Sequence, residues 1–172
     1  MINRDEVVRR SKLDCDIKDH LLMLYDLVVE IKAQVVVELG AGHSTYALMA
    51  GVNKTGGCFW SVDHRSLPSI DNPRYSRNVM DDMEYLKQWS REIDVLFIDT
   101  SHKYEHTKRE LAGWFPWVRV GGVIALHDTD GQDGENPGCR QALDEFLEKN
   151  KGAYKETYYP YCNGLSVIKK LR

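Results

Sequence analysis

Imidazole and carboxylate side chains occur together after two predicted strands of the 172-residue sequence, those that end near residues 99 and 127. Asp99 is followed three residues later by His102, and His127 is followed directly by Asp128. Either kind of group can take the proton of an attacking hydroxyl group or bind a metal ion that activates it. We therefore take Asp99, His102 and His127 as candidate catalytic residues. The structural alternatives are a helix cap for His102, a buried hydrogen-bonded ring for His127 and a turn-closing side chain for Asp128.

A glycine-containing loop, residues 38–44, lies earlier in the chain. Gly40 and Gly42 let the backbone approach a ligand without interference from a Cβ atom. The loop lacks the third glycine of the dinucleotide fingerprint, because Thr45 stands at that position, and this disfavours NAD. The structural alternative is a tight turn between a strand and a helix.

Two acidic residues follow the next apolar runs. Asp63 ends the run 58–63, and an ionised carboxylate there offers two oxygens that can accept both hydroxyls of a ribose. Asp82 follows the run 77–80, where a carboxylate or its neighbouring backbone can meet the amino group of an adenine. The alternative for Asp82 is a helix N-cap, and both roles can hold together.

The elements that position these residues follow from hydrophobic periodicity. Apolar residues recur at helical spacing from Ile17 to Ile31. Strands are predicted over residues 35–39, 58–63, 77–80, 93–99 and 123–127. Helices are predicted from 44 to about 50, from 82 to 90, from 102 to about 115 and from about 139 to 149. A closing hairpin is predicted over 154–161 and 165–169, with its turn at Asn163 and Gly164.

This alternation of strands and helices predicts an α/β fold with a mostly parallel sheet and helices on both faces. We expect a Rossmann-like, doubly wound, seven-stranded sheet with an antiparallel C-terminal strand. Residues 1–172 are predicted to form a single domain, in which 1–33 are an N-terminal helical segment and 34–172 the α/β core. Ligands bind such sheets beyond the carboxyl ends of the strands, where the residues named above lie.

The composition narrows the class of protein. The chain is 42% hydrophobic and 28% charged, which is typical of a globular protein, and its formal net charge is -3. That charge gives no electrostatic reason to expect nucleic acid. No run is long enough to span a membrane or resembles a signal peptide, and the four cysteines form no Cys-x-x-Cys pair. We therefore expect a cytoplasmic protein with free thiols and no membrane partner.

Five segments in order resemble the class I S-adenosylmethionine-dependent methyltransferases, and within them a small family related to bacterial sugar and natural-product O-methyltransferases. The segments are 36–45, 60–63, 94–99 with His102 and Tyr104, 121–128 and 137–142. The resemblance as a whole extends over roughly residues 34–169. The resemblance implies S-adenosylmethionine as the cofactor and the hydroxyl of a small molecule, a sugar or natural product, as the methyl acceptor.

The resemblance also implies a role for individual residues. Four of them would surround the methionine part of the cofactor: Glu38, Gly40, Gly42 and Ser44. Asp63 would hold the ribose, and Asp82 and Met83 would lie near the adenine. Asp99 would lie beside the amino-acid end of the cofactor and the transferred methyl group.

Some relatives hold a divalent metal with carboxylates at the positions of Asp99, His127 and Asp128. Histidine at the middle position shifts the expected preference away from magnesium, although a site for Mg or Mn stays open. The alternative is that Asp99 or a histidine acts as the base without any ion.

Three rival functions are considered beside the methyltransferase. A hydrolase with Ser44 as nucleophile is disfavoured, because Tyr46 stands where the nucleophile elbow requires glycine. A non-catalytic cofactor-binding module and a metal-dependent, hydroxylase-like enzyme on the same fold are the other two. A homodimer is also compatible with the sequence.

Overall fold

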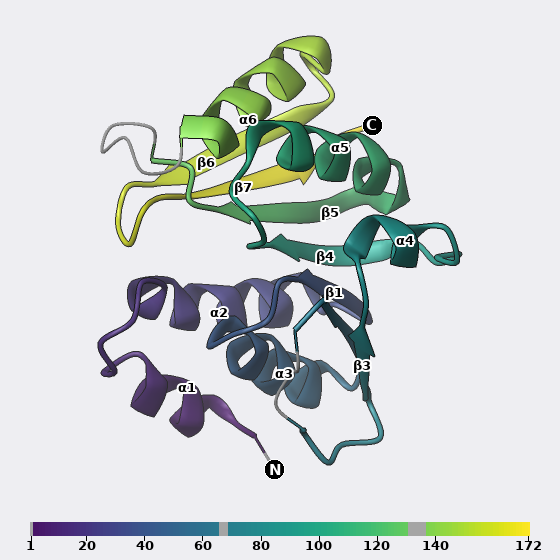
Figure 1. Cartoon of the computed structure of the whole chain (residues 1–172). Coiled ribbons are helices and arrows are strands. Elements are labelled where there is room, and N and C mark those ends of the chain that lie inside the picture. Colours follow the sequence, from purple (N-terminus) through teal and green to yellow (C-terminus); the bar gives the residue numbers. More distant parts are fainter. Residues whose placement is uncertain (1, 66–68, 131–136) are drawn as a thin grey trace.

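The computed structural model describes residues 2–65, 69–130 and 137–172 (Figure 1). These residues form a seven-stranded sheet in the order β3-β2-β1-β4-β5-β7-β6. The first five strands in this order are parallel, and β7 pairs antiparallel with β5 and β6. The strands are β1 Val35–Leu39, β2 Cys58–Asp63, β3 Tyr75–Val79, β4 Ile93–Ile98, β5 Val118–His127, β6 Tyr154–Tyr159 and β7 Leu165–Lys170. The predicted fold class, including the antiparallel C-terminal strand, is confirmed.

Helices cover both faces of this sheet. Figure 1 shows α1, α2 and α3 on one side and α5 and α6 on the other. The helices are α1 Arg4–Arg10, α2 Leu21–Ile31, α3 Ser44–Thr55, α4 Asp82–Leu86, α5 Tyr104–Trp114 and α6 Pro137–Lys149. Two 3-10 turns, Lys18–His20 and Phe115–Trp117, precede α2 and follow α5.

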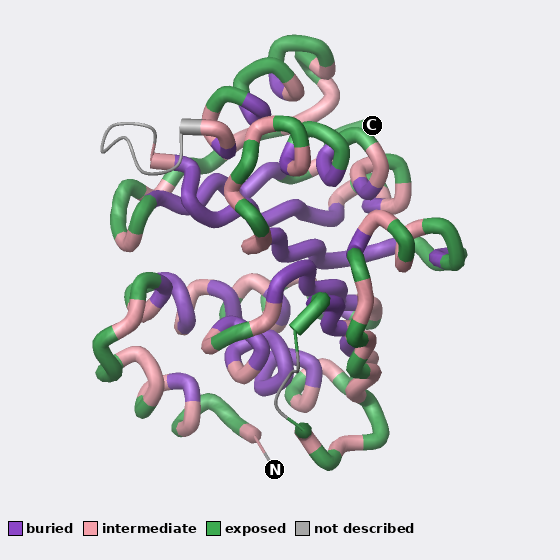
Figure 2. Tube along the Cα trace, viewed as in Figure 1, coloured by how far each residue is buried: buried purple, intermediate pink, exposed green. Residues whose placement is uncertain are grey.

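The two faces have separate hydrophobic cores, because successive side chains of a strand point in opposite directions. Val36 of β1 packs in the cluster that contains α2 and α3. Its neighbour Val37 packs in the cluster that contains Leu111 of α5 and Leu143 of α6. β4 is buried along its whole length, and Figure 2 shows buried residues concentrated at the centre of the sheet. The central strands are therefore fixed from both sides.

The predicted N-terminal helix over residues 17–31 is divided. A 3-10 turn, Lys18–His20, precedes α2, and Leu21, Leu24 and Val28 of the predicted apolar stripe are buried. The predicted apolar stripe is therefore confirmed for α2, whereas the first turn of the predicted helix has the tighter 3-10 geometry.

The helix predicted to end near residue 50 continues to Thr55. Gly51 lies inside it, where a Cβ atom would be 2.7 Å from the side chain of Val28. The glycine thus permits close packing of α3 on α2 instead of ending the helix. Gly56, with a φ of 79°, is the residue that ends it.

β5 begins at Val118, five residues before its predicted start at Val123. The two glycines at 121 and 122 were expected to form the turn into the strand. Gly121 has a φ of 81°, and the register with β4 shifts between Ile93 and Val95. The glycines therefore form an irregularity within a longer strand, as in a β-bulge.

Other boundaries moved by a few residues. β3 begins at Tyr75 rather than 77, β4 ends at Ile98 rather than 99, α4 ends at Leu86 rather than 90, and α5 begins at Tyr104 rather than 102. Of the helices in the described part of the chain, none combines the length and apolar character needed to cross a membrane.

Candidate functional site

The loop after β1 is built around a glycine that no other residue could replace without movement. Gly40 has a φ of 81°, and a Cβ atom there would lie 1.7 Å from the carbonyl oxygen of Asp99. The loop after β1 therefore lies directly against the loop after β4. A Cβ atom on Gly42, by contrast, would meet nothing within 4 Å. The backbone at Gly42 thus borders open space, which is what a loop that contacts a ligand requires.

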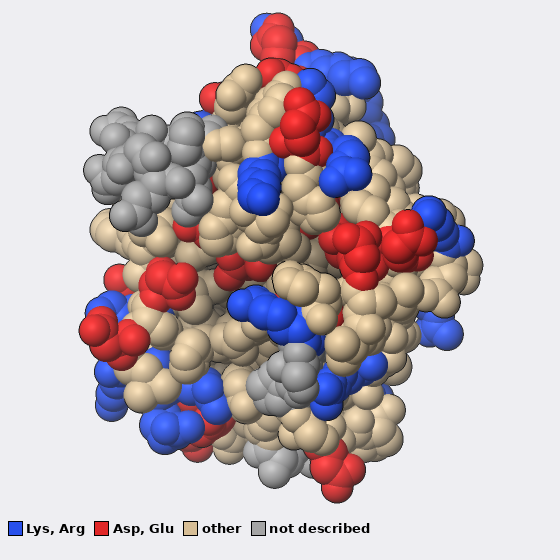
Figure 3. Space-filling model, viewed as in Figure 1, with Lys and Arg blue, Asp and Glu red and all other residues tan. Residues whose placement is uncertain are grey.

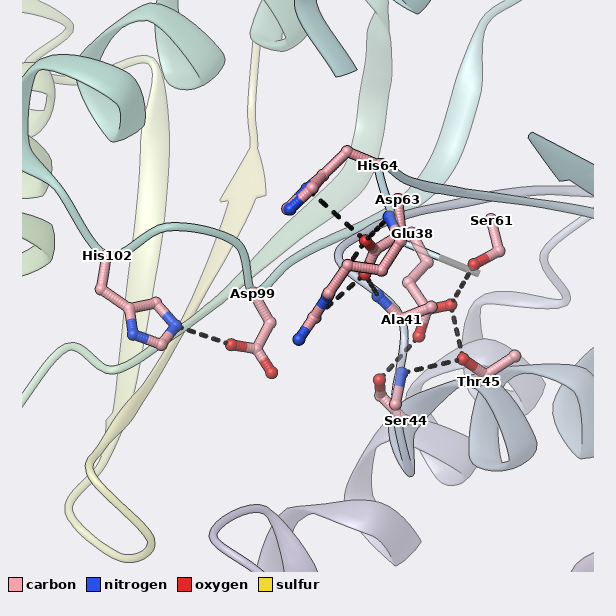
Figure 4. Close-up of polar contacts among 11 residues, drawn as sticks. Glu38, Ala41, Ser44, Thr45, Ser61, Asp63, His64, Asp99 and His102 are labelled. Atoms are coloured by element: carbon pink, nitrogen blue, oxygen red, sulfur yellow. Dashed lines mark hydrogen bonds and ion pairs between the residues drawn. The ribbon is translucent and has the colours of Figure 1, made fainter. Parts of the chain in front are cut away.

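Glu38 lies beneath this loop. It is fully buried, and its carboxylate accepts hydrogen bonds from three hydroxyls, those of Ser44 at 2.6 Å, Thr45 at 2.8 Å and Ser61 at 2.6 Å (Figure 4). Burial raises the pKa of Glu38 to about 7, although the hydroxyls oppose this. Both oxygens are occupied, so Glu38 fixes the start of α3 from within the protein.

Ser44 is one of these donors and is itself buried. Its hydroxyl is committed to Glu38, an arrangement unlike that of an exposed nucleophile beside a histidine base. The hydrolase alternative is therefore disfavoured by geometry as well as by sequence. The sequence analysis did not predict Thr45 and Ser61 as part of this network. The signal available in the sequence was that residues with hydroxyl groups come after an acidic residue within a buried strand.

Asp63 lies at the carboxyl end of β2 with its side chain 2% exposed. It accepts hydrogen bonds from the backbone N–H of Ala41 at 3.0 Å and of Arg65 at 2.7 Å. The Arg65 guanidinium adds two more, at 3.2 Å and 3.1 Å. Burial raises the pKa of Asp63, but these hydrogen bonds outweigh it and hold the pKa below the ordinary value. Asp63 is therefore an ionised acceptor; its guanidinium partner Arg65 was not predicted.

A cavity of about 350 Å³ opens between these loops, a size typical of small-molecule sites. Gly40, Asp63, Asp82 and Thr100 are among the residues that line it. Met83, predicted with Asp82 to lie near the adenine, is partly buried and packs against the hydrophobic cluster that contains Leu111 of α5. The loops after β1 to β4 thus meet around one cavity, as the topology predicted.

Asp82 does not cap α4. The N-cap is Asp81, whose side chain accepts the backbone N–H groups of Met83 and Glu84. Asp82 Oδ1 instead lies 3.0 Å from His106 Nε2, which is also 3.4 Å from Glu110 Oε1. Burial, followed by the charge of Glu110, raises the pKa of Asp82 to about 6.

His106 and Glu110 were missed by the sequence analysis. Their i,i+4 spacing on α5 was visible, but nothing in the sequence placed that helix face against Asp82.

The second half of the site joins the loops after β4 and β5. His102 Nε2 lies 3.0 Å from Asp99 Oδ1 and 3.0 Å from Asp128 Oδ2. His102 and Asp128 have φ values of 54° and 56°, which residues other than glycine seldom adopt. Asp99, His102 and Asp128 are thus brought together by two residues in the left-handed backbone conformation. Figure 4 shows the side chains of His102 and Asp99 pointing toward one another.

These contacts perturb the titration of both partners. The hydrogen bond with Asp99 raises the pKa of His102, although burial opposes it. Burial alone would raise the pKa of Asp99, but His102 and His127 outweigh it and lower the pKa far below the ordinary value. Asp99 is therefore ionised at neutral pH and makes His102 a stronger base than a free imidazole.

His127 lies behind this pair and is fully buried. Its Nδ1 is 2.8 Å from Asp128 Oδ2 and 3.6 Å from Asp99 Oδ1. Burial lowers its pKa, but Asp128 and Asp99 outweigh burial and raise the pKa to about 10. His127 therefore supplies a positive charge that compensates the two carboxylates.

His20, which precedes α2, was not predicted near the site. Its ring packs edge-on against His127 with centroids 5.7 Å apart, and its Nε2 is 2.7 Å from the carbonyl oxygen of Tyr161. The N-terminal segment and the β6–β7 turn thus both reach the inner side of the site.

Three donor atoms in this group are close enough to share a metal ion. Asp99, His102 and Asp128 each offer one atom, and these atoms lie within 4.8 Å of one another. The predicted metal set contained His127 in place of His102. In the structure His127 Nδ1 is hydrogen-bonded to Asp128 Oδ2, and the group of neighbouring donor atoms contains His102. On the face that Figure 3 shows, acidic and basic side chains are interspersed.

A family described as "Methyltransferase domain" matches residues 37–129, more than half of the chain. Solved structures share the fold. A protein from Corynebacterium glutamicum is 16% identical with a TM-score of 0.74, over 98% of this chain and 90% of that one. An O-methyltransferase from Bacillus cereus in complex with SAH (S-adenosylhomocysteine) is 16% identical with a TM-score of 0.68, over 96% and 89%.

A third similar structure includes a metal. The MycE methyltransferase of the mycinamycin biosynthetic pathway, in complex with Mg, SAH and mycinamycin VI, is 19% identical with a TM-score of 0.68. The alignment covers 91% of this chain and 49% of that one.

Proposed function

The chain belongs to the methyltransferase domain family, and we propose that it transfers the methyl group of S-adenosylmethionine to a hydroxyl group of a small molecule. One observation carries the proposal. The cavity lined by Asp63 borders the loop of Asp99, and His102 is held between Asp99 and Asp128 at 3.0 Å from each. A cavity that would hold a nucleoside cofactor thus lies beside a group that would accept a proton, at one edge of the sheet.

The residues present fit the cofactor. S-adenosylmethionine supplies a methyl group on a sulfonium centre, which a nucleophile attacks in line. Asp63 would accept the ribose hydroxyls in place of the Arg65 guanidinium that it now binds. Asp82 would lie toward the adenine. The open backbone at Gly42, on the loop that Glu38 fixes, would meet the methionine end, with Asp99 facing the acceptor.

His102 would remove the proton of the acceptor hydroxyl. Its Nε2 is hydrogen-bonded to Asp99 Oδ1 and lies 3.0 Å from Asp128 Oδ2, and because Asp99 is ionised this nitrogen carries the hydrogen. Nδ1 is then the atom that takes a proton, and the carboxylates stabilise the resulting cation, as in a histidine–aspartate pair. The side chain is 29% exposed, so the base is accessible to an acceptor.

A metal-assisted form of the same reaction is the second candidate. Asp99, His102 and Asp128 would hold a divalent ion through mixed oxygen and nitrogen donors, a set that suits Mn²⁺ better than Mg²⁺. The ion would lower the pKa of a bound hydroxyl. The Mg²⁺ in the MycE complex motivates this candidate.

Methyl transfer is tested directly by following the formation of S-adenosylhomocysteine in the presence of a panel of sugars, phenols and other hydroxylated small molecules. We expect acceptor-dependent turnover by the wild-type protein. Adding EDTA, then Mg²⁺ or Mn²⁺, separates the two forms of the reaction. Cofactor binding without turnover on any hydroxylated acceptor would favour the non-catalytic module.

A further inference from the structure

The wall of the cavity toward α5 contains a charged cluster that the proton transfer does not use. It consists of Asp82 at the start of α4 and of His106 and Glu110 on α5. Glu110 is fully buried and Asp82 is 7% exposed. Asp82 and His106 line the cavity, whereas Glu110 lies behind them. Two buried carboxylates beside one imidazole require a defined arrangement of protons.

The contacts of His106 define that arrangement. The contact with Glu110 raises the pKa of His106 to about 9, although burial and the charge of Arg109, whose guanidinium lies 3.3 Å from Nδ1, oppose this. Nε2 carries a hydrogen in the protonated ring and faces Asp82 Oδ1 at 3.0 Å and Glu110 Oε1 at 3.4 Å. These two contacts give the ring one orientation.

Glu110 links this cluster to the loop after β4. Its Oε1 accepts the hydroxyl of Thr100 at 2.8 Å. Thr100 follows Asp99 directly and lines the same cavity. The cluster therefore ties the start of α4 to the loop that holds Asp99.

Asp82 is the member of the cluster suited to contact a ligand. Oδ1 forms an ion pair with His106 Nε2 at 3.0 Å, and a carboxylate oxygen can also accept a hydrogen bond from a ligand. Burial and the neighbouring Glu110 favour the neutral acid, as the raised pKa of Asp82 indicates. The charge of His106 opposes that tendency. Without His106, Asp82 would lose both its orientation and its preference for the charged form.

We propose that His106, held by Glu110, is a positioning residue that keeps Asp82 as the hydrogen-bond acceptor for the amino group of the cofactor's adenine, so that the pocket selects adenine over a 6-oxopurine. This inference rests on the proposed cofactor and is independent of the methyl acceptor. A 6-oxopurine presents a carbonyl oxygen at that place, which would face the carboxylate without a hydrogen between them.

The test is a pair of calorimetric titrations with S-adenosylhomocysteine and S-inosylhomocysteine. Wild-type protein is expected to bind the adenosyl compound at least about tenfold more tightly. His106→Leu should reduce that ratio toward one, and His106→Gln, whose amide can still donate to Asp82, should restore part of it. Asp82→Asn should also remove the preference, because its amide can donate to the oxo group. His64→Ala, at the ribose end of the same cavity, should leave the ratio unchanged.

The outcomes separate this inference from the function on which it rests. If wild type binds both compounds equally tightly, the proposed selection of adenine is wrong, whereas the proposed cofactor site is still supported. An unchanged ratio in His106→Leu and Asp82→Asn also overturns the inference. If wild type binds neither compound, the cofactor itself is wrong. Thermal unfolding of each variant identifies misfolded protein, in which case the ratio in His106→Gln and Asp82→Asn decides.

Discussion

His102 reaches its two carboxylate partners through a backbone conformation that few residues other than glycine adopt. Its φ is 54°, and that of Asp128 is 56°. Such torsions cost roughly 1–3 kcal/mol each and persist where surrounding contacts hold them. The two 3.0 Å contacts of His102 Nε2 are contacts of that kind. Strain at two adjoining residues is consistent with a site arranged before its ligands bind.

Replacing His102 by Gln should lower kcat by about 10²–10⁴-fold, the usual contribution of a general base. Glutamine can still donate to Asp99 or Asp128, so the fold should be retained. The affinity for S-adenosylhomocysteine should stay within about twofold, a difference of only about 0.4 kcal/mol. Steady-state kinetics on the acceptor found by the screen, with calorimetry on the same samples, checks both values. Undiminished kcat would remove His102 from the mechanism.

The pH dependence of kcat follows from the same contacts. A base works only when it is unprotonated, so kcat should rise with pH through the pKa of His102. Asp99 raises that pKa above the ordinary value of 6.5, so the inflection should lie above pH 6.5. Asp128→Asn removes one nearby negative charge and should shift the inflection to lower pH. An inflection that does not move in this variant contradicts the assignment of His102 as the base.

At the scale of elements, Asp94 joins the beginnings of three strands. Its Oδ2 accepts the backbone N–H groups of Gln34 and Val35, both at 2.8 Å, and its Oδ1 pairs with Arg119 at the start of β5. Asp94→Ala should lower the free energy of unfolding by about 2–3 kcal/mol. Urea unfolding checks this, with the exposed Asp71→Ala as the control, expected within about 0.5 kcal/mol of wild type.

The stabilisation that Asp94 gives to the folded state depends on pH. Burial raises its pKa, but Arg119 and the two backbone N–H groups outweigh burial and lower it below 3.8. The stabilisation is therefore complete above the unfolded pKa and is lost as pH falls through the lower folded pKa. The difference between wild type and Asp94→Ala should shrink in strongly acidic urea titrations. A constant difference down to those pH values would contradict this.

The two glycines of the first loop allow a matched comparison. Gly40→Ala would place a Cβ atom 1.7 Å from the Asp99 carbonyl oxygen at a φ of 81°, whereas Gly42→Ala meets nothing within 4 Å. Gly40→Ala should lose about 2 kcal/mol or more of stability, and Gly42→Ala should unfold like wild type. Equal stabilities in thermal or urea unfolding would show that the loop does not require glycine at position 40.

For the whole molecule, much of the fold was predictable because the buried strands are continuous apolar runs, such as residues 35–39 and 93–98. The α/β class and the antiparallel C-terminal strand were confirmed, as was the family resemblance. Element ends were less predictable, because Gly51 and Gly121 serve tertiary packing and strand register and do not mark the ends of elements.

The position of the site was predictable where residues end a strand, as Asp63 does, or directly follow one, as Asp99 and Asp128 do. It was not predictable where contacts depend on elements distant in the sequence. His20 precedes α2 yet packs against His127, and His106 of α5 contacts Asp82 of α4. Such pairs depend on how helices lie on the sheet, which a single sequence does not specify. The catalytic and metal roles of these residues stay predictions.

The most direct test of the account is calorimetric titration of S-adenosylmethionine and S-adenosylhomocysteine into wild-type protein and into Asp63→Ala, with NAD as the control ligand. We predict saturable binding of the first two to wild type, no binding of NAD, and an affinity at least about tenfold weaker in Asp63→Ala, because the ribose hydroxyls lose a charged acceptor. Absence of binding to wild type, or equal affinity in the variant, would contradict the cofactor site described for this cavity.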